Sequence, residues 1–387
     1  MTFQFVSLQA MFLLSKSWFF IDTIFRIFGV YPLQRIGKEE LRPTPKCRFW
    51  FRYIFTAIWV QVLMVTPMAY ILCKETTLKE YSDAFIKSLA ATSIDKLTFA
   101  MTFLGQIVLH FTCLKHMDQL GKCLVSLQQD FNTKVRIFIE DKNTLKFYFF
   151  LFIWLSFEVA NYACGYLSIH YKIQSELNLS YMATNAGLIG MILFQAFVTS
   201  TPFYFTFVYT ETTMKILDYC KSINKQSEEI IMKESNMLIH VLKQFNKMSA
   251  PFLFYIISYD FCFVIIMGFF IYVRTNTLLF VGSFSWQDWL IFTGFVFHFL
   301  RTILLLYVFC TLSDDVASEV QELKTDVIDF EVQNGRTTSI IQKLDQFKGF
   351  SAYGYFTLNQ SLLTGMTTNF ATFLVILIQF KQAEGTD

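Results

Sequence analysis

The chain has 387 residues and a formal net charge of +2 at pH 7; 54% of the residues are hydrophobic and only 16% are charged. Soluble proteins carry about 25% charged residues, so this composition argues against a set of soluble domains and favours a membrane protein. No soluble region with a basic stripe is present, and we therefore expect no nucleic-acid partner.

Enzyme and metal-site motifs are also missing from the sequence. The P-loop, G-x-S-x-G, G-x-G-x-x-G and H-E-x-x-H patterns do not occur, and the five His are widely separated. The eight Cys show no C-x-x-C spacing, which argues against a zinc site or a disulfide framework. We therefore expect a protein that is not an enzyme and that holds neither a metal nor a cofactor.

Residues 1–49 are predicted to form a cytoplasmic N-terminal region. The apolar stretch over residues 1–33 is interrupted by Lys16, Asp22 and Arg26, and it lacks the basic start of a signal peptide. An interfacial helix lying on the cytoplasmic membrane surface fits this pattern better. A basic segment marked by prolines follows and leads to the first span.

Seven apolar runs follow, each close to the 20 residues that cross a bilayer as a helix. They predict an all-α membrane protein with seven transmembrane helices. Lys87, Asp95 and Lys96 make the second run the least uniform of the seven. The runs lie near residues 50–72, 88–114, 147–171, 186–210, 250–273, 287–311 and 359–380.

Basic residues alternate between the links that join these runs. The links on one side, with the N-terminal region, carry 24 Lys and Arg, whereas the links on the other side, with the C-terminal tail, carry 6. By the positive-inside rule the N-terminus is cytoplasmic and the C-terminus is outside, the reverse of a G-protein-coupled receptor. The Asn178 sequon then falls in an outside loop, which makes it a glycosylation candidate.

These boundaries divide the chain into five regions. They are the N-terminal region 1–49, the six-span region 50–311 with cytoplasmic loops 115–146 and 211–249, the cytoplasmic helices 312–358, the last span 359–380 and the extracellular tail 381–387.

The segment between the sixth and seventh spans carries a coiled-coil-type pattern, with apolar positions four and three residues apart. An acidic stripe runs beside this apolar seam, and a second helix is predicted to begin at 337–347 and continue towards the last span. The acids either form a solvated face on the chain's own bundle or belong to an inter-subunit anchor near an ion exit. The seam comprises Val316, Val320, Leu323, Val327 and Phe330, and the acidic stripe comprises Asp315, Glu319, Glu322, Asp326 and Asp329.

Polar or small side chains recur every three or four residues along the last run, which places them on one helix face. A span that faces only lipid has no use for such a stripe, whereas a span that lines a water-filled axis does. The alternative is a face of small residues packed against a neighbouring helix. This polar stripe comprises Ser361, Gly365, Thr368, Thr372 and Gln379, with Val375 and Ile376 in its largest gap.

Ionisable side chains fall inside several spans, where they are costly and often functional. Glu158, Asp260 and Arg301 lie near the middle of the third, fifth and sixth spans. Either Arg301 pairs with one carboxylate as a structural clamp, or these residues touch a ligand directly. Asp95 and Lys96 in the second span either face a water-filled cavity or form a local salt bridge.

Aromatic side chains with a few amides and hydroxyls in the outer halves of the spans predict a small-molecule pocket between spans two and six. Trp at this depth also serves as a membrane-interface anchor. The aromatic character favours bitter or other plant-derived compounds over a sugar, which would need more converging polar groups. The candidate pocket residues are Asp95, Glu158, Asn161, Tyr162, Tyr166, Gln195, Trp289 and Phe292.

The end of the last run resembles the terminal signature of the insect gustatory receptors, which is Thr-Tyr, five apolar residues and Gln-Phe. Here Thr372-Phe373 is followed by residues 374–378 and by Gln379-Phe380. Phe373 stands where the family usually has Tyr, so any hydrogen bond of that Tyr is lost. The related odorant receptors share the architecture but usually lack the Gln-Phe ending.

The resemblance implies a tastant-gated, non-selective cation channel in the plasma membrane of gustatory neurons, as a homotetramer or a heteromer with other gustatory receptors. Each subunit would contribute its last helix to a central pore and its cytoplasmic helices to a shared anchor. The alternatives are a sugar receptor, an odorant-type subunit that needs a co-receptor, a transporter or a metabotropic receptor. The implied pore and gate residues are Thr368, Thr372, Val375, Ile376, Gln379 and Phe380, with Ile376 preferred over Val375 at the constriction, and Asp315, Glu319, Glu322 and Asp326 form the anchor and ion exit.

Overall fold

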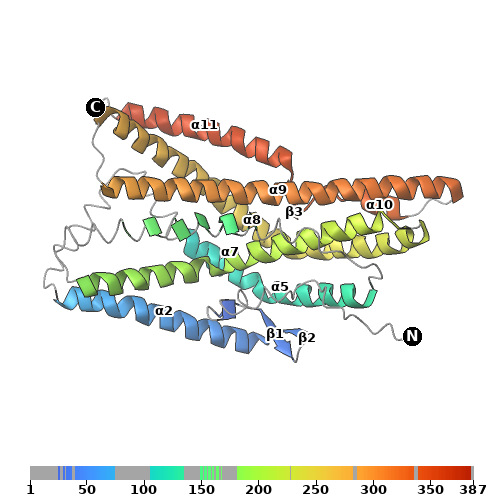
Figure 1. Ribbon diagram of the computed structural model, residues 1–387, viewed down its shortest axis with the longest axis horizontal. Coiled ribbons are helices and arrows are strands. Elements are labelled where there is room, and N and C mark those ends of the chain that lie inside the picture. The colour runs from blue at the N-terminus through green and yellow to red at the C-terminus, as the bar shows by residue number, and fades with distance from the viewer. Residues whose placement is uncertain are drawn as a thin grey trace.

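The structure is a computed structural model, and most of its described residues lie in long helices that run roughly parallel to one axis (Figure 1). Two small antiparallel hairpins accompany these helices. The structure describes residues 25–26, 29–30, 32–36, 40–74, 105–134, 149–150, scattered positions from 152 to 167, and residues 181–226, 228–281, 286–334 and 339–384.

The described helices and strands have the following bounds. The helices are α2 (Lys46–Lys74), α5 (Gln106–Lys134), α7 (Tyr181–Ile223), α8 (Glu228–Val281), α9 (Trp286–Asn334), α10 (Ser339–Asp345) and α11 (Gln360–Glu384). The hairpins pair β1 (Leu33–Ile36) with β2 (Glu40–Pro43) and β3 (Ser351–Ala352) with β4 (Phe356–Thr357).

Five predicted spans coincide with helices, since 50–72 lies within α2, 186–210 within α7, 250–273 within α8, 287–311 within α9 and 359–380 almost entirely within α11. Among the described residues, three segments are long and apolar enough to cross a membrane. These segments are Ile230–Tyr272, Phe292–Asp329 and Gln360–Gln379.

The helices extend well beyond the spans. At 1.5 Å per residue, the 54 residues of α8 measure about 80 Å, whereas the hydrocarbon core of a bilayer is about 30 Å thick. The predicted link 211–249 is therefore mostly helical, since α7 ends at Ile223, a turn follows at residues 224–226, and α8 begins at Glu228. Beyond the predicted spans, the extensions of α7, α8 and α9 form a helical layer, which α10 joins (Figure 1).

The apolar seam of α9 is the core of this helical layer. Val316, Val320, Leu323 and Val327 are each completely buried, and α9 packs there against α7, α8 and α10. The side chain of Phe330 lies outside the described set. Because the described seam residues are already buried within one chain, an inter-subunit contact in this layer has to use its outward faces.

Polar contacts also hold the helical layer together. Tyr219 donates a hydrogen bond of 2.6 Å to Glu234, and burial together with this carboxylate raises the pKa of the Tyr219 hydroxyl. Lys324 of α9 donates to Asp345 of α10 at 2.6 Å, which lowers the pKa of the Asp345 carboxyl. These pairs fix α8 to α7 and α10 to α9.

The predicted helix at 337–347 was expected to continue towards the last span, and this prediction is wrong. The helix α10 ends at Asp345, and the β3–β4 hairpin then intervenes before α11. Tyr353 and Gly354 both have positive φ, of 54° and 78°, as the tight turn of such a hairpin requires. Phe350, just before the hairpin, is fully buried among Tyr209, Phe245 and Phe347, so this bend is part of the core.

The predicted interfacial helix at 1–33 lies mostly outside the described residues. Its described end is packed into the protein, because Phe25 is buried with its ring 4.8 Å from that of Tyr204 of α7. Val30 is completely buried as well. This end of the N-terminal region therefore contacts the bundle.

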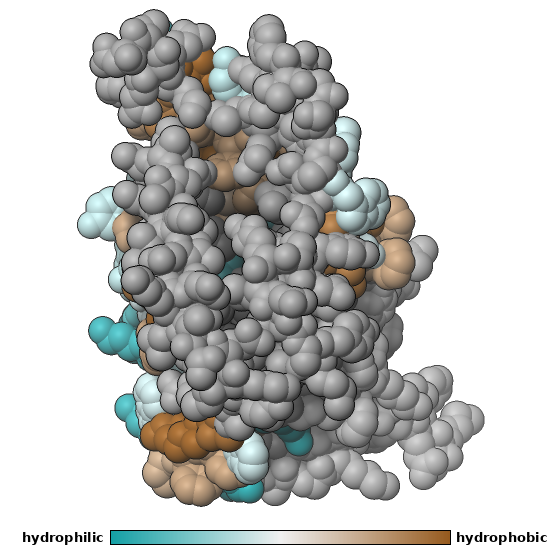
Figure 2. Space-filling view, turned by 90° about the vertical axis from the view of Figure 1, so that its left-hand side faces the viewer, coloured by the Kyte–Doolittle hydropathy of each residue, from teal (hydrophilic) through white to brown (hydrophobic). Residues whose placement is uncertain are grey.

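Helix α2 presents an aromatic and aliphatic face to its surroundings. An apolar surface of this kind is unfavourable in water but is suited to contact with lipid. Figure 2 looks along the long axis of the molecule and shows hydrophobic side chains at its lower edge, the side on which α2 lies. The exposed hydrophobic residues of α2 are Trp50, Phe51, Ile54, Phe55, Ile58, Trp59 and Val62.

Candidate functional site

Helix α11 lies at one edge of the molecule and packs against α8 and α9 (Figure 1). Its first turn is held by two contacts to backbone N–H groups, which a helix start leaves without partners in the helix. The side chain of Asn359 accepts from Leu362 N at 2.8 Å, and Asp314 of α9 accepts from Gln360 N at 2.7 Å. The start of α11 is therefore fixed to α9, and Asn359 has a structural role.

One face of α11 supplies its contacts with the rest of the chain. Leu362, Leu363 and Met366 pack against the main core. One turn further on, Phe370 lies against Gly268 of α8 and Phe299 of α9, with the two phenylalanine ring centroids 5.9 Å apart. These apolar residues occupy a single side of the helix.

The polar stripe lies on the opposite face of α11 and points away from the rest of the chain. At about 100° per residue, Thr372 and Gln379 lie nearly opposite Phe370. Space around Gly365 is open, with no heavy atom within 4 Å of a Cβ built there. The alternative in which the polar stripe packs against a neighbouring helix of the same chain is therefore wrong. Ser361, Gly365, Thr368, Thr372 and Gln379 are all exposed.

The hydroxyls of the polar stripe use their protons within the helix. Thr368 donates to the carbonyl of Thr364 at 3.0 Å, and Thr372 donates to the carbonyl of Thr368 at 3.0 Å. A hydroxyl oxygen has two acceptor lone pairs, so each oxygen presents acceptor capacity outward. The face of α11 that carries the polar stripe is called its free face below. This arrangement is suited to water or cations on the free face.

Val375 and Ile376 lie on either side of the line from Thr372 to Gln379. The side chain of Val375 is 53% exposed and that of Ile376 is 38% exposed. Both side chains therefore belong to the free face. Phe373 is 48% exposed, and the side chain of Phe380 lies outside the described set.

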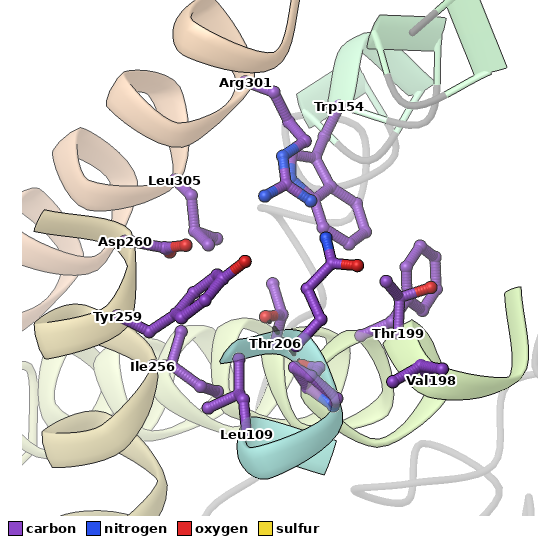
Figure 3. A pocket seen from close by; sticks show the side chains of 13 residues that line it. Leu109, Trp154, Val198, Thr199, Thr206, Ile256, Tyr259, Asp260, Arg301 and Leu305 are labelled. Carbon is purple, nitrogen blue, oxygen red and sulfur yellow. Dashed lines mark hydrogen bonds between the residues drawn. The ribbon is translucent and has the colours of Figure 1, made fainter. Parts of the chain in front are cut away.

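A small cavity lies between α5, α7, α8, α9 and Trp154 (Figure 3). It encloses about 40 Å³, which is room for a few water molecules, whereas benzene needs a cavity of about 150 Å³. In this conformation the cavity is too small for an aromatic ligand. Its polar lining comes from Gln106, Thr199, Thr206, Tyr259, Asp260 and Arg301.

Asp260 of α8 and Arg301 of α9 both line this cavity (Figure 3), and a clamp between them stays a prediction. Neither side chain is without a partner, and the guanidinium of Arg301 also lies 3.4 Å from Nε2 of His298. The other candidate clamp residue, Glu158, lies outside the described residues.

The predicted outer-half pocket falls largely outside the described part of the chain. Trp289 and Phe292 of α9 are described, and their rings make an edge contact with centroids 6.0 Å apart. Trp289 is 41% exposed, and neither residue lines the cavity of Figure 3. The residues outside the described set are Asp95, Glu158, Asn161, Tyr162, Tyr166, the glycosylation candidate Asn178 and the side chain of Gln195.

A buried histidine network joins three helices and was not found from the sequence. His110 of α5 lies 3.1 Å from the hydroxyl of Tyr53 in α2 through Nε2, and 3.1 Å from Oγ1 of Thr201 in α7 through Nδ1. Since Thr201 donates its proton to the carbonyl of His110 at 3.2 Å, the Nδ1–H of His110 donates to Thr201, and Nε2 accepts from Tyr53. The only sequence signal was a lone His inside an apolar run.

The acidic stripe of α9 divides into two groups. Glu319 accepts from the side chain of Asn224 at 3.2 Å and lies 3.7 Å from Lys221, so it holds the end of α7. Asp315 and Glu322 are exposed. The pKa of Asp326 is raised, mainly by burial and also by the neighbouring acids. Glu319 is therefore engaged with α7, whereas Asp315, Glu322 and Asp326, called the outward acids below, are available to solvent.

Comparison with known proteins agrees with this fold. Two solved structures of the olfactory receptor OR5 from Machilis hrabei are similar, one of them in complex with eugenol. Each is 13% identical and covers 94% of this chain and 98% of the receptor, with a TM-score of 0.63 for the eugenol complex and 0.58 for the other structure. No curated protein sequence matches significantly.

The family described as "7tm Chemosensory receptor" matches residues 20–384, nearly the whole length of the chain. This match agrees with the seven predicted spans and with the resemblance of the last helix to insect chemoreceptors. The chain is therefore a multi-pass membrane receptor and not an enzyme, and it belongs to the seven-transmembrane chemosensory receptor family of insects.

Proposed function

We propose that the protein is a gustatory receptor that acts as a tastant-gated, non-selective cation channel in the plasma membrane of gustatory neurons. The observation that carries this proposal is the free face of α11. The span Gln360–Gln379 is apolar enough to cross a membrane, and no residue of its most apolar stretch is fully buried within the chain, yet its outward face carries the polar stripe. If four copies of α11 surround a central axis, their outward faces line a water-filled pore.

The gate is formed by the extracellular end of this lining. Ile376 and Gln379, with Phe380 beside them, narrow the pore, and a ring of such side chains blocks ions by dewetting. Val375 lies on the other flank of the polar stripe and is the alternative to Ile376 at this constriction. Cations leave past Thr372, Thr368 and the outward acids of α9.

The ligand site lies in the outer half of the bundle, among spans two to six, and takes bitter or other plant-derived compounds. The cavity of Figure 3 lies between α8 and α9 and is lined by Asp260 of α8 and Arg301 of α9. Since α11 packs on these same two helices, a ligand that shifts α8 relative to α9 also shifts the pore helix.

Currents from the reconstituted protein test this function. Purified protein in a planar bilayer, with no G protein present, should pass cation current when a panel of tastants is applied. A cysteine at Thr372 or Gln379 should make this current sensitive to a charged methanethiosulfonate reagent. Phe373→Cys is the matched control, because Phe373 is also exposed but projects about 100° away from Thr372.

Two results would contradict the proposal. If the reconstituted protein passes no tastant-evoked current, a transporter or a metabotropic receptor becomes the better account. If the reagent acts equally on all three cysteine variants and on the unsubstituted chain, the polar stripe does not line the pore.

An odorant-type subunit is the second candidate, and the structural similarity to an olfactory receptor favours it. A receptor of that type would need a co-receptor for current. Expression with and without a co-receptor, using volatile compounds and tastants in parallel, separates the two candidates. Tastant-evoked currents from this chain alone support the gustatory assignment.

A further inference from the structure

A second and larger cavity lies between α7 and α9 at the end of the spans nearest the helical layer. It encloses about 200 Å³, more than the roughly 150 Å³ that accommodates benzene. It shares no lining residue with the cavity of Figure 3. Its lining residues are Phe150, Thr210, Met214, Leu217, Lys221, Tyr307, Val308, Thr311, Leu312 and Asp315.

The position of this cavity matches the boundary between membrane and cytoplasm. Thr210 and Thr311 stand at the ends of the predicted spans 186–210 and 287–311, and Phe150 lies near the start of the span 147–171. Lys221 and Asp315 belong to the helical layer beyond them. The cavity therefore has one end in the hydrocarbon region and the other at the level of lipid headgroups.

The walls and the mouth of the cavity differ in chemistry. The walls are mainly the apolar side chains of Met214, Leu217, Val308 and Leu312, whereas Lys221 and Asp315 supply a positive and a negative charge. Glu319 does not line the cavity but lies 3.7 Å from Lys221, so two negative groups and one positive group lie at or near the mouth. An anionic headgroup would be repelled there, while a neutral group with hydroxyls could donate to Asp315 and accept from Lys221.

A buried hydroxyl inside the cavity points to a polar ligand atom. Thr210 is only 2% exposed and lines the cavity, and among the described residues its Oγ1 has no hydrogen-bond partner. One turn earlier, Thr206 donates to the carbonyl of Pro202 at 3.0 Å, which shows how a helical Thr on α7 is otherwise satisfied. Leaving a buried hydroxyl unpaired is unfavourable, and a ligand hydroxyl or ester oxygen would remove that cost.

We propose that this cavity binds a neutral, hydroxyl-headed amphiphile such as a monoacylglycerol. Its chain lies along the walls formed by α7 and α9, its glycerol group lies between Lys221 and Asp315, and one of its oxygens pairs with Thr210. The assignment to the inner leaflet rests on the orientation proposed above. Binding itself does not depend on the chain being a channel.

Photolabelling of the purified full-length protein in lipid nanodiscs tests this site. The probe is a monoacylglycerol with a diazirine on its acyl chain, and mass spectrometry locates the labelled residues. Label is expected within 210–217 and 307–312. Val308→Trp fills the cavity and should reduce this label at least about 5-fold, whereas Ile303→Trp, on an exposed position of the same helix, should not.

Two further comparisons test the polar contacts. Thr210→Val keeps the volume and should weaken labelling by about 2- to 10-fold, the effect of one lost hydrogen bond. Thr112→Val is the matched control, since Thr112 is exposed and bonded to its own helix. A fatty-acid probe with the same chain should label weakly, and Asp315→Asn should increase its labelling relative to that of the glycerol probe.

Three outcomes would overturn the proposal. Equal labelling of the Val308→Trp and Ile303→Trp variants would show that the probe reports only bulk lipid. Stronger labelling by the fatty-acid or a cationic probe in the unsubstituted chain would reject the neutral headgroup. No label in either segment would show that the cavity takes no lipid. None of these readouts uses ion current, so they are independent of the proposed function.

Discussion

The ring of Phe370 on α11 covers Gly268 on α8 so closely that a Cβ at Gly268 would lie 2.6 Å from two ring carbons. The absence of a side chain at Gly268 is what allows the last helix to sit against α8 at this depth. Close approach of helices at small residues is a common way to pack helices in membranes.

Gly268→Ala should displace α11 or force a new rotamer of Phe370. We expect a lower thermal stability in detergent, by about 1 to 3 kcal/mol for overpacking, together with altered basal current. Gly365→Ala is the control for folding, because nothing lies within 4 Å of its Cβ. Unchanged stability and current in Gly268→Ala would show that α11 is not held at this contact.

Shortening the apolar residues beside the polar stripe should change the closed state of the pore. Ile376→Ala and Val375→Ala each remove part of the apolar constriction, so dewetting is weaker and basal current rises. Single-channel recording without tastant measures this effect. We expect the larger increase for Ile376→Ala, and an increase for Val375→Ala alone would place Val375 at the gate instead.

Breaking the histidine network should destabilise the bundle. His110→Phe leaves the buried hydroxyls of Tyr53 and Thr201 without their imidazole partner, which costs about 1 to 3 kcal/mol. Thermal unfolding in detergent, followed by fluorescence, measures the loss. Thr112→Val on the same helix should change stability little. A stable His110→Phe variant would mean that the network contributes nothing.

The acidic stripe should make the stability of the helical layer depend on pH. The pKa of Asp326 is raised in the folded chain by burial, Glu322 and Asp329, above the value of about 3.9 for an unfolded Asp. The folded state therefore holds this proton more tightly, so the stabilising effect is complete below the unfolded pKa and is lost as pH rises through the folded pKa.

Asp326→Asn should accordingly raise the thermal stability at pH 7, and the difference from the unsubstituted chain should shrink as the pH falls towards 4. Added salt should shrink it as well, because the repulsion is partly exposed and screened. Melting curves at several pH values measure both trends. A variant that is less stable at pH 7 would show that the Asp326 carboxylate is favourable in the folded layer.

Neutralising the outward acids should lower cation conductance if they line the ion exit. We expect a reduced single-channel conductance for the double variant Glu322→Gln with Asp326→Asn, most clearly at low ionic strength. Asp345→Asn is the matched control, since this exposed acid is already bonded to Lys324. Equal conductance in all three proteins would assign the acidic stripe to solvation only.

Local patterns in the sequence were sufficient for much of the fold. Length and hydrophobicity placed five of the described spans, because crossing a bilayer imposes the same requirement on each segment separately. The seam from Val316 to Val327 was also correct as an apolar helix face. The sequence did not reveal that this seam is buried within one chain, because the 4-3 spacing is the same for a partner in the same chain or in another.

The features missed from the sequence depend on contacts between distant segments. His110 meets Tyr53 and Thr201 only through the packing of three helices. The end of α10 at Asp345 is decided by the hairpin, and the hairpin is held by Phe350 inserting into the core and by Asn246 of α8, which accepts from Ser351 N at 2.7 Å. No local propensity signals those contacts.

The sequence by itself determined that α11 is a membrane-spanning helix with one polar face, because spacing along a helix places its side chains around the axis. Only the tertiary structure decided which way that face points. Phe370, Gly268 and Phe299 anchor the apolar side of α11 to α8 and α9, and the polar stripe is therefore left outward. The direction follows from burying the apolar side, which stabilises the helix against its neighbours through close packing.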